Sequence, residues 1–533
     1  MPRPYKFTQA VGIIRRLFGF YPQDPVIRPF TFDGIDADLS EQTYKGTISV
    51  ELVPGRFYFL LLGVLCSALK RTNSYRIEAI VPRSINAAMG LGTLAVMRRT
   101  PWVVRLEVGP WIRAYGHLID SIGYWSSSWI SPVQIWRSAR EARRLWNLYQ
   151  HQSLCSGLKI DGIEVSDLII DTYLRYKPAP NFDISDPFVI KLIFQAIQDI
   201  RLAKAYFSKN RPQIYLTSYT TYIEHGIPVR VAMCLGVEVR SFGNLSFIGK
   251  QHFGNDFFHT PDYSNYKNLF DAIADKQQCL DQARNLLEFR MSGGIDQATF
   301  YMKSSAYSIE ETHLPSDIYG AAVVFLHDFY DSPHIYPGLI FSDFWDWICF
   351  TIEKLSSANI QFFLKPHPNQ IELSDSALLK LKTRYPSVRW LSKSVNNSKL
   401  AQAGIACGVT VYGTVAHELA YLGVPTVCCA DHPHRAFDFC RTASNKSEYE
   451  ALLMTCLECH SSRESMREEA LAFCYMHNFY GAEEDLILRD QIRDLWRISH
   501  DQNSTESELK SSLQTLKSSI GFDRLVSRIS ANA

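Results

Sequence analysis

The 533-residue sequence has no long apolar run, no internal repeat and no low-complexity tract. Its longest apolar stretch, Phe57–Leu69, has 13 residues, whereas a helix needs about 20 to cross a bilayer. We interpret this stretch as a buried strand that runs into a helix. Residues 1–20 carry Arg15 and Arg16 where a signal peptide would need an unbroken apolar segment. We therefore expect a soluble or peripheral protein in the cytoplasm.

Net charge is also nearly absent, since 55 Lys and Arg residues face 54 Asp and Glu. The charge is unevenly spread, however: residues 1–150 contain 19 Lys and Arg against 10 Asp and Glu. A basic N-terminal region suits an anionic partner, either a phospholipid surface or a charged glycan. A solvated basic face without any partner explains the same excess. We expect no nucleic-acid partner.

One predicted helix concentrates this positive charge. It begins at Ser131-Pro132, a capping residue followed by proline at the first helical position. Along it lie four arginines and two tryptophans, namely Arg137, Arg140, Arg143, Arg144, Trp136 and Trp146. Such a helix could lie on an anionic membrane. Alternatively, it is an ordinary surface helix whose tryptophans are in the core.

The 12 cysteines come without a secretion signal, so we expect reduced thiols and not a disulfide framework. The spacing Cys456-Leu-Glu-Cys459-His460 matches a haem-attachment pattern. Residues Tyr449–His460 also have the apolar spacing of a helix that faces a core, and we interpret these cysteines as structural. We predict no metal site.

The length predicts two large domains, because single cores rarely grow beyond 250–300 residues. Residues 1–312 are expected to form the first domain, with strands at Ile77–Pro82, Trp102–Leu106 and Gln213–Ser218. Polar helical residues 266–312 would lead out of it. Residues 313–480 would form the second domain. A helical tail over residues 481–533 would pack back on the first.

Strand-like and helix-like segments alternate at short spacing in the predicted second domain. The strands are Ala321–Leu326, Ile360–Leu364, Val388–Leu391, Gly408–Tyr412 and Pro425–Cys429, and the helices are Phe341–Ser357, Ser374–Tyr385, Ser398–Ala403 and Val415–Leu422. This alternation predicts an α/β fold with a parallel, doubly wound sheet. Such sheets bind ligands beyond the carboxyl ends of their strands.

The loop after the strand Ile360–Leu364 reads Lys365-Pro366-His367-Pro368-Asn369. The two prolines restrict the backbone so that His367 points outward. Lys365 and His367 can both donate hydrogen bonds to phosphate oxygens. The alternative is a histidine that caps the next helix.

The loop after Gly408–Tyr412 continues with Gly413-Thr414 and then Glu418. Gly413 allows the backbone to approach a ligand closely, and Thr414 is expected to cap the next helix. Free amides at that helix start would favour an anion. Glu418 would accept hydrogen bonds from ribose hydroxyls.

Two further loops are expected at the same edge of the sheet. One follows the strand Pro425–Cys429 and contains His432 and Arg435. The other follows Ala321–Leu326 and contains His327 and Asp328. Four strand ends with His, Lys, Arg and Thr side chains predict a pocket for a phosphorylated ligand.

The strings FLKPHPNQ, VTVYGTVAHELAYLGVPTV and VVFLHDFYDSPH resemble bacterial glycosyltransferases that build capsule and lipopolysaccharide chains. The resemblance covers about residues 155–445. It implies a GT-B fold, in which two Rossmann-like domains with parallel sheets face a central cleft and the second holds the donor nucleotide. The His-Pro pair resembles the phosphate-binding motif of bacterial sialyltransferases and Kdo transferases. This would assign His367 and Pro368 to the phosphate of a CMP- or UDP-linked donor, with Gly413 and Thr414 beside it.

Catalytic residues are expected in the first domain. Glycosyl transfer needs a carboxylate or histidine that removes the acceptor hydroxyl proton, or a carboxylate that stabilises the oxocarbenium-like centre. Glu224 and His225 follow the strand Gln213–Ser218 and are our first choice. Asp167 and Asp171 are the second, although helix capping and a salt bridge explain them equally well.

The sequence therefore predicts a metal-independent glycosyltransferase without a cofactor. It would transfer a sugar from a nucleotide sugar to a polysaccharide or glycolipid acceptor at the inner membrane face. One alternative is a nucleotide-sugar epimerase or polyol-phosphate transferase on a similar scaffold. Another is a non-catalytic scaffold of polysaccharide assembly.

Overall fold

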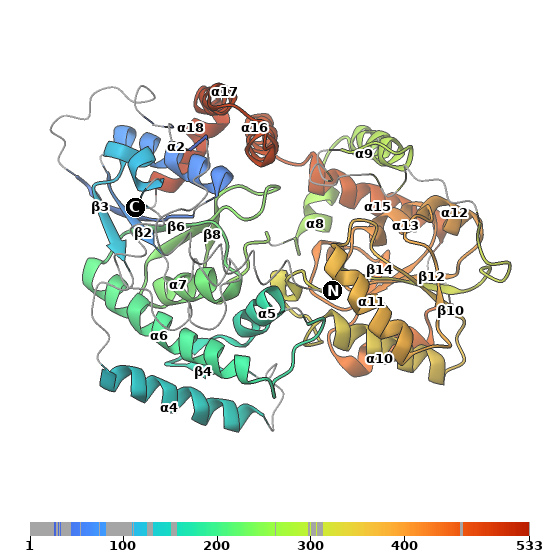
Figure 1. Cartoon of the computed structure of the whole chain (residues 1–533). Coiled ribbons are helices and arrows are strands. Elements are labelled where there is room, and N and C mark those ends of the chain that lie inside the picture. The colour runs from blue at the N-terminus through green and yellow to red at the C-terminus, as the bar shows by residue number, and fades with distance from the viewer. Residues whose placement is uncertain are drawn as a thin grey trace. The chain divides into compact units, whose positions relative to one another are not determined.

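A computed structural model of the chain describes residues 44–81, 109–124, 132–150, 157–296, 313–458 and 462–531, apart from positions 54, 74, 110, 178 and 262, together with residues 26, 27, 30, 32, 299, 305 and 307. These residues form two compact domains (Figure 1). The first domain comprises residues up to 176, residues 184–259 and residues from 482 onward. The second comprises residues 177–183 and 260–481. The predicted strand Trp102–Leu106 lies outside the described residues.

The first domain contains a six-stranded sheet with the order β3-β2-β1-β6-β7-β8. Neighbouring strands are parallel except for the antiparallel pair β7 and β8. The chain runs outward from β1 to β3 and then returns to place β6 beside β1, so the strand order reverses between β1 and β6. The strands are β1 (Gly46–Glu51), β2 (Tyr75–Val81), β3 (Ser121–Tyr124), β6 (Ile214–Thr217), β7 (Glu238–Ser241) and β8 (Lys250–His252).

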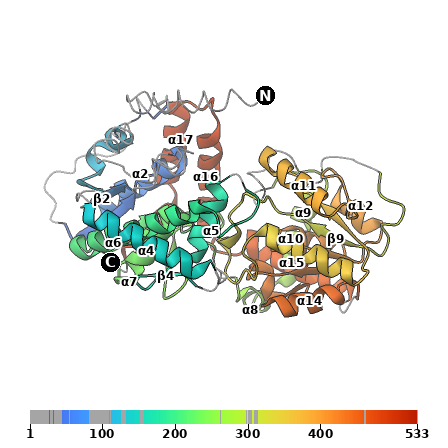
Figure 2. The same cartoon turned by 60° about the horizontal axis from the view of Figure 1, so that its bottom comes forward.

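Helices cover both faces of this sheet (Figure 1). On one face lie α4 (Pro132–Tyr149), α5 (Ser166–Tyr176), α6 (Pro187–Asn210) and α7 (Tyr222–Cys234), with the short hairpin β4 (Lys159–Ile160) and β5 (Ile163–Glu164) beside them. On the other face lie α2 (Arg56–Asn73) and the C-terminal helices α16 (Glu483–His500), α17 (Glu506–Lys517) and α18 (Ile520–Ser530) (Figure 2).

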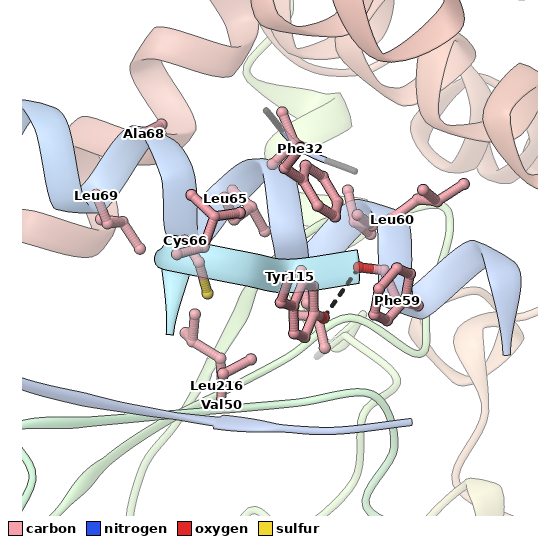
Figure 3. Close-up of a cluster of buried hydrophobic side chains, with 14 of the residues drawn as sticks. Phe32, Val50, Phe59, Leu60, Leu65, Cys66, Ala68, Leu69, Tyr115 and Leu216 are labelled. Atoms are coloured by element: carbon pink, nitrogen blue, oxygen red, sulfur yellow. Dashed lines mark hydrogen bonds between the residues drawn. The ribbon is translucent and has the colours of Figure 1, made fainter. Parts of the chain in front are cut away.

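Helix α2 is the centre of the first hydrophobic core (Figure 3). The prediction of a strand within Phe57–Leu69 is wrong, because one continuous helix spans Arg56–Asn73. Ring packing holds its N-terminal half: the rings of Phe59 and Tyr115 stack with centroids 4.2 Å apart, and the Tyr115 hydroxyl donates to the Phe59 carbonyl at 3.0 Å. Packing is tight at Gly63, where a Cβ would lie 2.3 Å from the Phe32 ring.

The second domain contains a fully parallel six-stranded sheet with the order β11-β10-β9-β12-β13-β14. Here the strand order reverses between β9 and β12. The strands are β9 (Ala322–Phe325), β10 (Phe362–Lys365), β11 (Arg389–Trp390), β12 (Cys407–Val409), β13 (Thr426–Cys428) and β14 (Cys440–Thr442). Every strand predicted for this domain is present, and the predicted α/β class is confirmed, with two Rossmann-like sheets that are parallel apart from β8.

Apolar side chains alternate between the two faces of this sheet, as a sheet covered on both sides requires. Ala322 and Val324 face the core under α10 and α14, whereas Val323 and Phe325 face the core under α12 and α13. The helices are α10 (Phe344–Ser357), α11 (Glu372–Arg384), α12 (Asn397–Gln402), α13 (Val415–Tyr421) and α14 (Lys446–Met454).

The boundary between the domains differs from the one expected at residue 312. Helices α8 (Tyr266–Asp271) and α9 (Lys276–Met291) belong to the second domain, where they pack on α15 (Arg463–Asn478). Leu280, Ala283 and Leu287 of α9 share a buried cluster with residues of α13 and α15. This apolar face attaches α9 to the second core. Among the described helices, none is both long and apolar enough to cross a bilayer.

Candidate functional site

A pocket opens in the second domain at the point where the strand order reverses. It is lined by the ends of β9 and β10, the loop after β12, the start of α13 and residues of α9. Its volume of about 100 Å³ has room for several water molecules, and thus for a phosphate-sized group. The polar residues of the lining include Arg290, Tyr307, His327, Lys365, His367, Thr410 and Glu418.

Lys365, the last residue of β10, is the buried cation of this pocket. Its side chain is 2% exposed, and its ammonium group has no hydrogen-bond partner among the described residues. Burial lowers the pKa of Lys365 to about 8, although the negative charge of Glu418 acts in the opposite direction. A buried ammonium without a partner is costly, and an anion in the pocket would remove that cost.

His367 presents a hydrogen-bond donor from the next turn of the chain. Its Nδ1 accepts a hydrogen bond from the Asn369 backbone amide at 3.2 Å. The neutral ring therefore carries its proton on Nε2. Burial lowers the pKa of His367, so the neutral form prevails at pH 7. The alternative of a helix cap is wrong, because His367 caps only its own loop and α11 begins at Glu372.

Arg290 of α9 is a second buried cation beside the pocket. Its Nε donates to Asp296 at 2.6 Å and its Nη1 to Glu418 at 3.0 Å. Burial alone would lower the pKa of Arg290, but these two carboxylates raise it. Tyr307 donates to the other oxygen of Glu418 at 2.6 Å. Both oxygens of Glu418 therefore accept hydrogen bonds from protein side chains. Arg290 Nη2 has no hydrogen-bond partner among the described residues.

The loop after β12 forms the opposite wall. Thr410 Oγ1 and His327 Nε2 lie 3.2 Å apart, and burial lowers the pKa of His327 to about 3, so this ring is neutral. A Cβ on Gly413 would lie 3.0 Å from Thr410 Oγ1 and 3.6 Å from His327 Nε2. Thr414 is exposed, and its hydroxyl makes no capping hydrogen bond, so the predicted cap is wrong.

Four residues predicted for donor binding, Asp328, Asn369, His432 and Arg435, do not line the pocket. Asp328 accepts hydrogen bonds from the Ile371 amide and the Ser374 hydroxyl, each at 2.8 Å, and so fixes the start of α11. Arg435 forms an ion pair with Asp431. His432 is buried behind β13 and β14. Asn369 serves as the donor to His367, and Pro368 lines the pocket.

One group of described side chains has the composition of a metal site. Potential ligand atoms of Cys428, His432 and Cys440 all lie within 4.8 Å of one another. His432 Nδ1, however, accepts a hydrogen bond from the His434 amide at 3.1 Å. His432 Nδ1 also lies 2.8 Å from His434 Nδ1, and its Nε2 lies 3.2 Å from Thr442 Oγ1. Both ring nitrogens of His432 therefore contact protein side chains.

A second polar cluster lies in the first domain, at the reversal between β1 and β6. Glu51, the last residue of β1, has a fully buried side chain. One of its oxygens accepts hydrogen bonds from Ser218 N at 2.8 Å and Ser218 Oγ at 2.7 Å. Thr217 Oγ1 lies 3.0 Å from the same oxygen and equally far from the Tyr219 carbonyl. The other oxygen of Glu51 lies 2.5 Å from His225 Nδ1. Glu51 was not predicted from the sequence.

Glu224 is less suited to catalysis than its neighbour. It is 5% exposed, and Tyr176 donates to its Oε1 at 2.5 Å. Its Oε2 is buried and has no partner. Burial raises the pKa of Glu224, which favours its protonated form. The geometry thus favours His225 over Glu224.

The two predicted aspartates, Asp167 and Asp171, both lie on α5. Asp167 forms a two-pronged ion pair with Arg230, whose Nη1 also donates to the Glu164 carbonyl at 2.6 Å. Asp171 is 2% exposed within the same helix. The ion pair agrees with the salt-bridge alternative for Asp167.

No protein-family model and no curated protein matches the chain. Among solved structures, the UDP-GlcNAc 2-epimerase of Methanocaldococcus jannaschii in complex with UDP-GlcNAc and UDP is 11% identical, over 79% of this chain and 97% of that one, with a TM-score of 0.25. KpsC of Thermosulfurimonas dismutans, a beta Kdo 2,4 transferase, is 13% identical over 49% and 79%, with a TM-score of 0.31. A putative UDP-N-acetylglucosamine 2-epimerase of Listeria monocytogenes is 10% identical over 80% and 91%, with a TM-score of 0.23.

The class of protein follows from strand order: an α/β protein of two Rossmann-like domains, each with a polar cluster where its strand order reverses.

Proposed function

We propose that the chain is a glycosyltransferase that transfers a sugar from a nucleotide-linked donor to a polysaccharide or glycolipid acceptor. The observation that carries the proposal is Lys365, a buried ammonium group that has no hydrogen-bond partner among the described residues and lines a pocket at the switch point of a parallel sheet. Phosphate groups of nucleotide ligands bind at such points. Two such domains in one chain are also what the GT-B class requires.

The donors around the pocket suit a phosphate. Lys365 Nζ, His367 Nε2–H and the two N–H groups of Arg290 Nη2 are available for hydrogen bonds. Because Arg290 already faces Asp296 and Glu418, the charge that an anion would neutralise is that of Lys365.

The same donors would assist the reaction itself. When the bond between the sugar and the nucleotide phosphate breaks, negative charge develops on the leaving phosphate oxygen. Donors that are already fixed in place stabilise that charge without reorganising. Lys365 and Arg290 are fixed by burial and by ion pairs, and they would take this role without a metal ion.

The experiment is a thermal-shift screen with CMP, CDP, UDP and GDP on the wild type, Lys365→Met and His367→Ala. We expect at least one nucleotide to raise the melting temperature of the wild type and to have little effect on either variant. Lys380→Met, on the exposed face of α11, is the matched control and should respond like the wild type. A wild type that responds to none of the four nucleotides contradicts the proposal.

The reaction class is tested by incubation with UDP-GlcNAc and CMP-Kdo without any acceptor. A glycosyltransferase releases nucleotide slowly under these conditions, because only water is available as acceptor. An epimerase would bind the same phosphate but change the configuration of the sugar while the sugar remains linked to the nucleotide. Conversion of an intact donor would therefore replace the proposal by the epimerase alternative.

We also propose that α4 places the first domain on an anionic membrane surface. Its outward face carries Arg137, Arg140, Arg143 and Arg144 together with Trp136, which is 60% exposed. Arg140 stacks over the Trp136 ring at 5.7 Å. The apolar residues Val133 and Leu148, 57% and 54% exposed, lie on the same face. Arginine with exposed tryptophan suits the lipid headgroup region.

A further inference from the structure

The carboxylate of Glu51 has hydrogen-bond partners at both of its oxygens. It is fully buried at the carboxyl end of β1, and the amide and hydroxyl of Ser218 both donate to one of its oxygens. Burial alone would raise the pKa of Glu51, but His225 and Ser218 hold it below its usual value. The carboxylate is therefore ionised and immobile, and its second oxygen is directed at His225 Nδ1.

This contact decides the tautomer of His225. An ionised carboxylate only accepts hydrogen bonds, so Nδ1 must carry a proton and the lone pair of the neutral ring lies on Nε2. The His225 side chain is 17% exposed, and among the described residues none bonds to Nε2. The ring thus has one nitrogen fixed in the interior and one with an available lone pair.

The other groups near the ring do not compete for this proton. Burial lowers the pKa of His259 to about 3, so that ring is neutral. Burial alone would lower the pKa of His225 as well, but the charge and hydrogen bond of Glu51 raise it above its usual value. The titratable side chains around the pair are Glu224 of the same helix, His259, Tyr58 and Tyr219.

We propose that His225 is the general base of the transfer reaction and that Glu51 is its positioning residue. The inference rests on the proposed function and extends it to the acceptor side. The acceptor hydroxyl gives its proton to His225 Nε2, and its oxygen forms the bond to the anomeric carbon. The bond from that carbon to the nucleotide phosphate breaks, and the phosphate leaves with the electron pair. Glu51 stabilises the imidazolium that results.

The decisive variant is Glu51→Gln, because it should keep the fold and reverse the tautomer. The amide and hydroxyl of Ser218 require an acceptor, so the amide oxygen of Gln must take their side. Its NH₂ group then faces His225 Nδ1, which must accept. The proton moves to Nε2, and the ring loses the lone pair that the reaction needs.

The expected result is a protein with unchanged melting temperature shifts for nucleotides and nucleotide release slowed by about 10²–10⁴-fold. Nitrogen-15 NMR of histidine-labelled protein should show Nδ1–H in the wild type and Nε2–H in Glu51→Gln, with the His225 signals assigned from His225→Asn. His225→Asn should lose activity to a similar extent. Lys380→Met, on the exposed face of α11, is the control and should retain activity.

The results separate this inference from the proposed function. A wild type that binds none of the nucleotides contradicts the donor site, whereas the tautomer measured by NMR tests the Glu51–His225 pair independently of any substrate. A neutral wild-type ring whose single proton is on Nε2 overturns the inference. So does a His225→Asn or Glu51→Gln protein that binds nucleotide and releases it at the wild-type rate.

Discussion

At the residue scale, Lys365 lowers the stability of the domain that contains it. Its pKa is lowered from 10.5 to about 8 by burial, so the folded state binds this proton less tightly than the unfolded state does. The cost is fully present below pH 8 and disappears above pH 10.5. We expect Lys365→Met to raise the free energy of unfolding by up to about 3 kcal/mol at pH 7. Urea denaturation at pH 7 and pH 10.5 measures the difference.

The gain should shrink toward zero at the higher pH, and Lys380→Met should show no gain at either pH. Equal stability of wild type and Lys365→Met at pH 7 would mean that the ammonium is solvated. The same substitution that stabilises the fold should abolish the nucleotide response. A residue that lowers the stability of the fold and binds a ligand is typical of a functional site.

Gly413 offers a graded test of the same pocket. Its backbone does not have a positive φ, so a side chain is compatible with the local conformation. A Cβ would lie 3.0 Å from Thr410 Oγ1, and larger groups would extend into the space beside His327. We expect Gly413→Ala to weaken the nucleotide-induced thermal shift and Gly413→Val to abolish it, while circular dichroism spectra stay unchanged. A Val variant with the full response would place the ligand elsewhere.

The sequence was informative about residues whose role depends on a local strand end. Lys365 and His367 could be identified because a buried strand leads directly into a loop bracketed by prolines. Arg290 and Glu51 could not be identified, because nothing in their own segments marks them. Arg290 reaches the pocket through the packing of α9 on α13 and α15, and Glu51 meets His225 across 174 residues of sequence.

At the scale of elements, α4 should bind the protein to anionic bilayers. We expect it to sediment with vesicles of phosphatidylglycerol and phosphatidylcholine but not with pure phosphatidylcholine, and to dissociate in high salt. Replacement of Arg137, Arg140, Arg143 and Arg144 by Gln should remove about 1 kcal/mol of binding per residue. Trp136→Ser should weaken binding at all salt concentrations.

Arg497→Gln, on an exposed position of α16, is the control and should bind like the wild type. Equal binding to neutral and anionic vesicles, or binding unaffected by the four substitutions, would contradict the role of α4. The two tryptophans of α4 differ in whether they lie in the core. Trp146 packs inward and donates to the Ile184 carbonyl at 2.7 Å, whereas Trp136 is exposed.

Strands could be predicted where a short apolar segment lies between two polar segments. The strands β9, β10, β12 and β13 are short apolar runs bounded by polar turns, which is why their positions agree with the prediction. The prediction for Phe57–Leu69 failed because this run, interrupted only by Gly63 and Ser67, shows no clear period. Helix α2 is apolar all around because sheet, loops and C-terminal helices surround it.

At the scale of the whole molecule, the chain passes between its two domains more than once. Residues 177–183 belong to the second domain, where the Phe182 amide donates to Asp343 at 2.6 Å. Two α/β domains followed from the alternation of segments along the sequence. Their borders did not, because the position of α8 and α9 is set by contacts with α15, far along the chain.

The C-terminal helices α16, α17 and α18 cover the core around α2. Ten buried apolar side chains of residues 482–533 belong to the core around α2, namely Leu488, Ile492, Leu495, Leu509, Leu513, Leu516, Phe522, Leu525, Val526 and Ile529. At about 1.5–3 kcal/mol for each buried side chain, their loss removes roughly 15–30 kcal/mol. A domain is stable by only about 5–15 kcal/mol. A chain that ends at Gly481 should therefore lose the first domain altogether.

The second domain contains none of these side chains and should survive the truncation. Limited proteolysis should digest the first domain of the shortened chain and leave a resistant fragment of about residues 260–481. A chain that ends at Ala531 keeps α18 and should resist like the full protein. If the chain ending at Gly481 keeps its N-terminal half resistant, α2 must find another cover for its apolar surface. The packing of α16 and α18 on α2 would then not be what holds the first domain together.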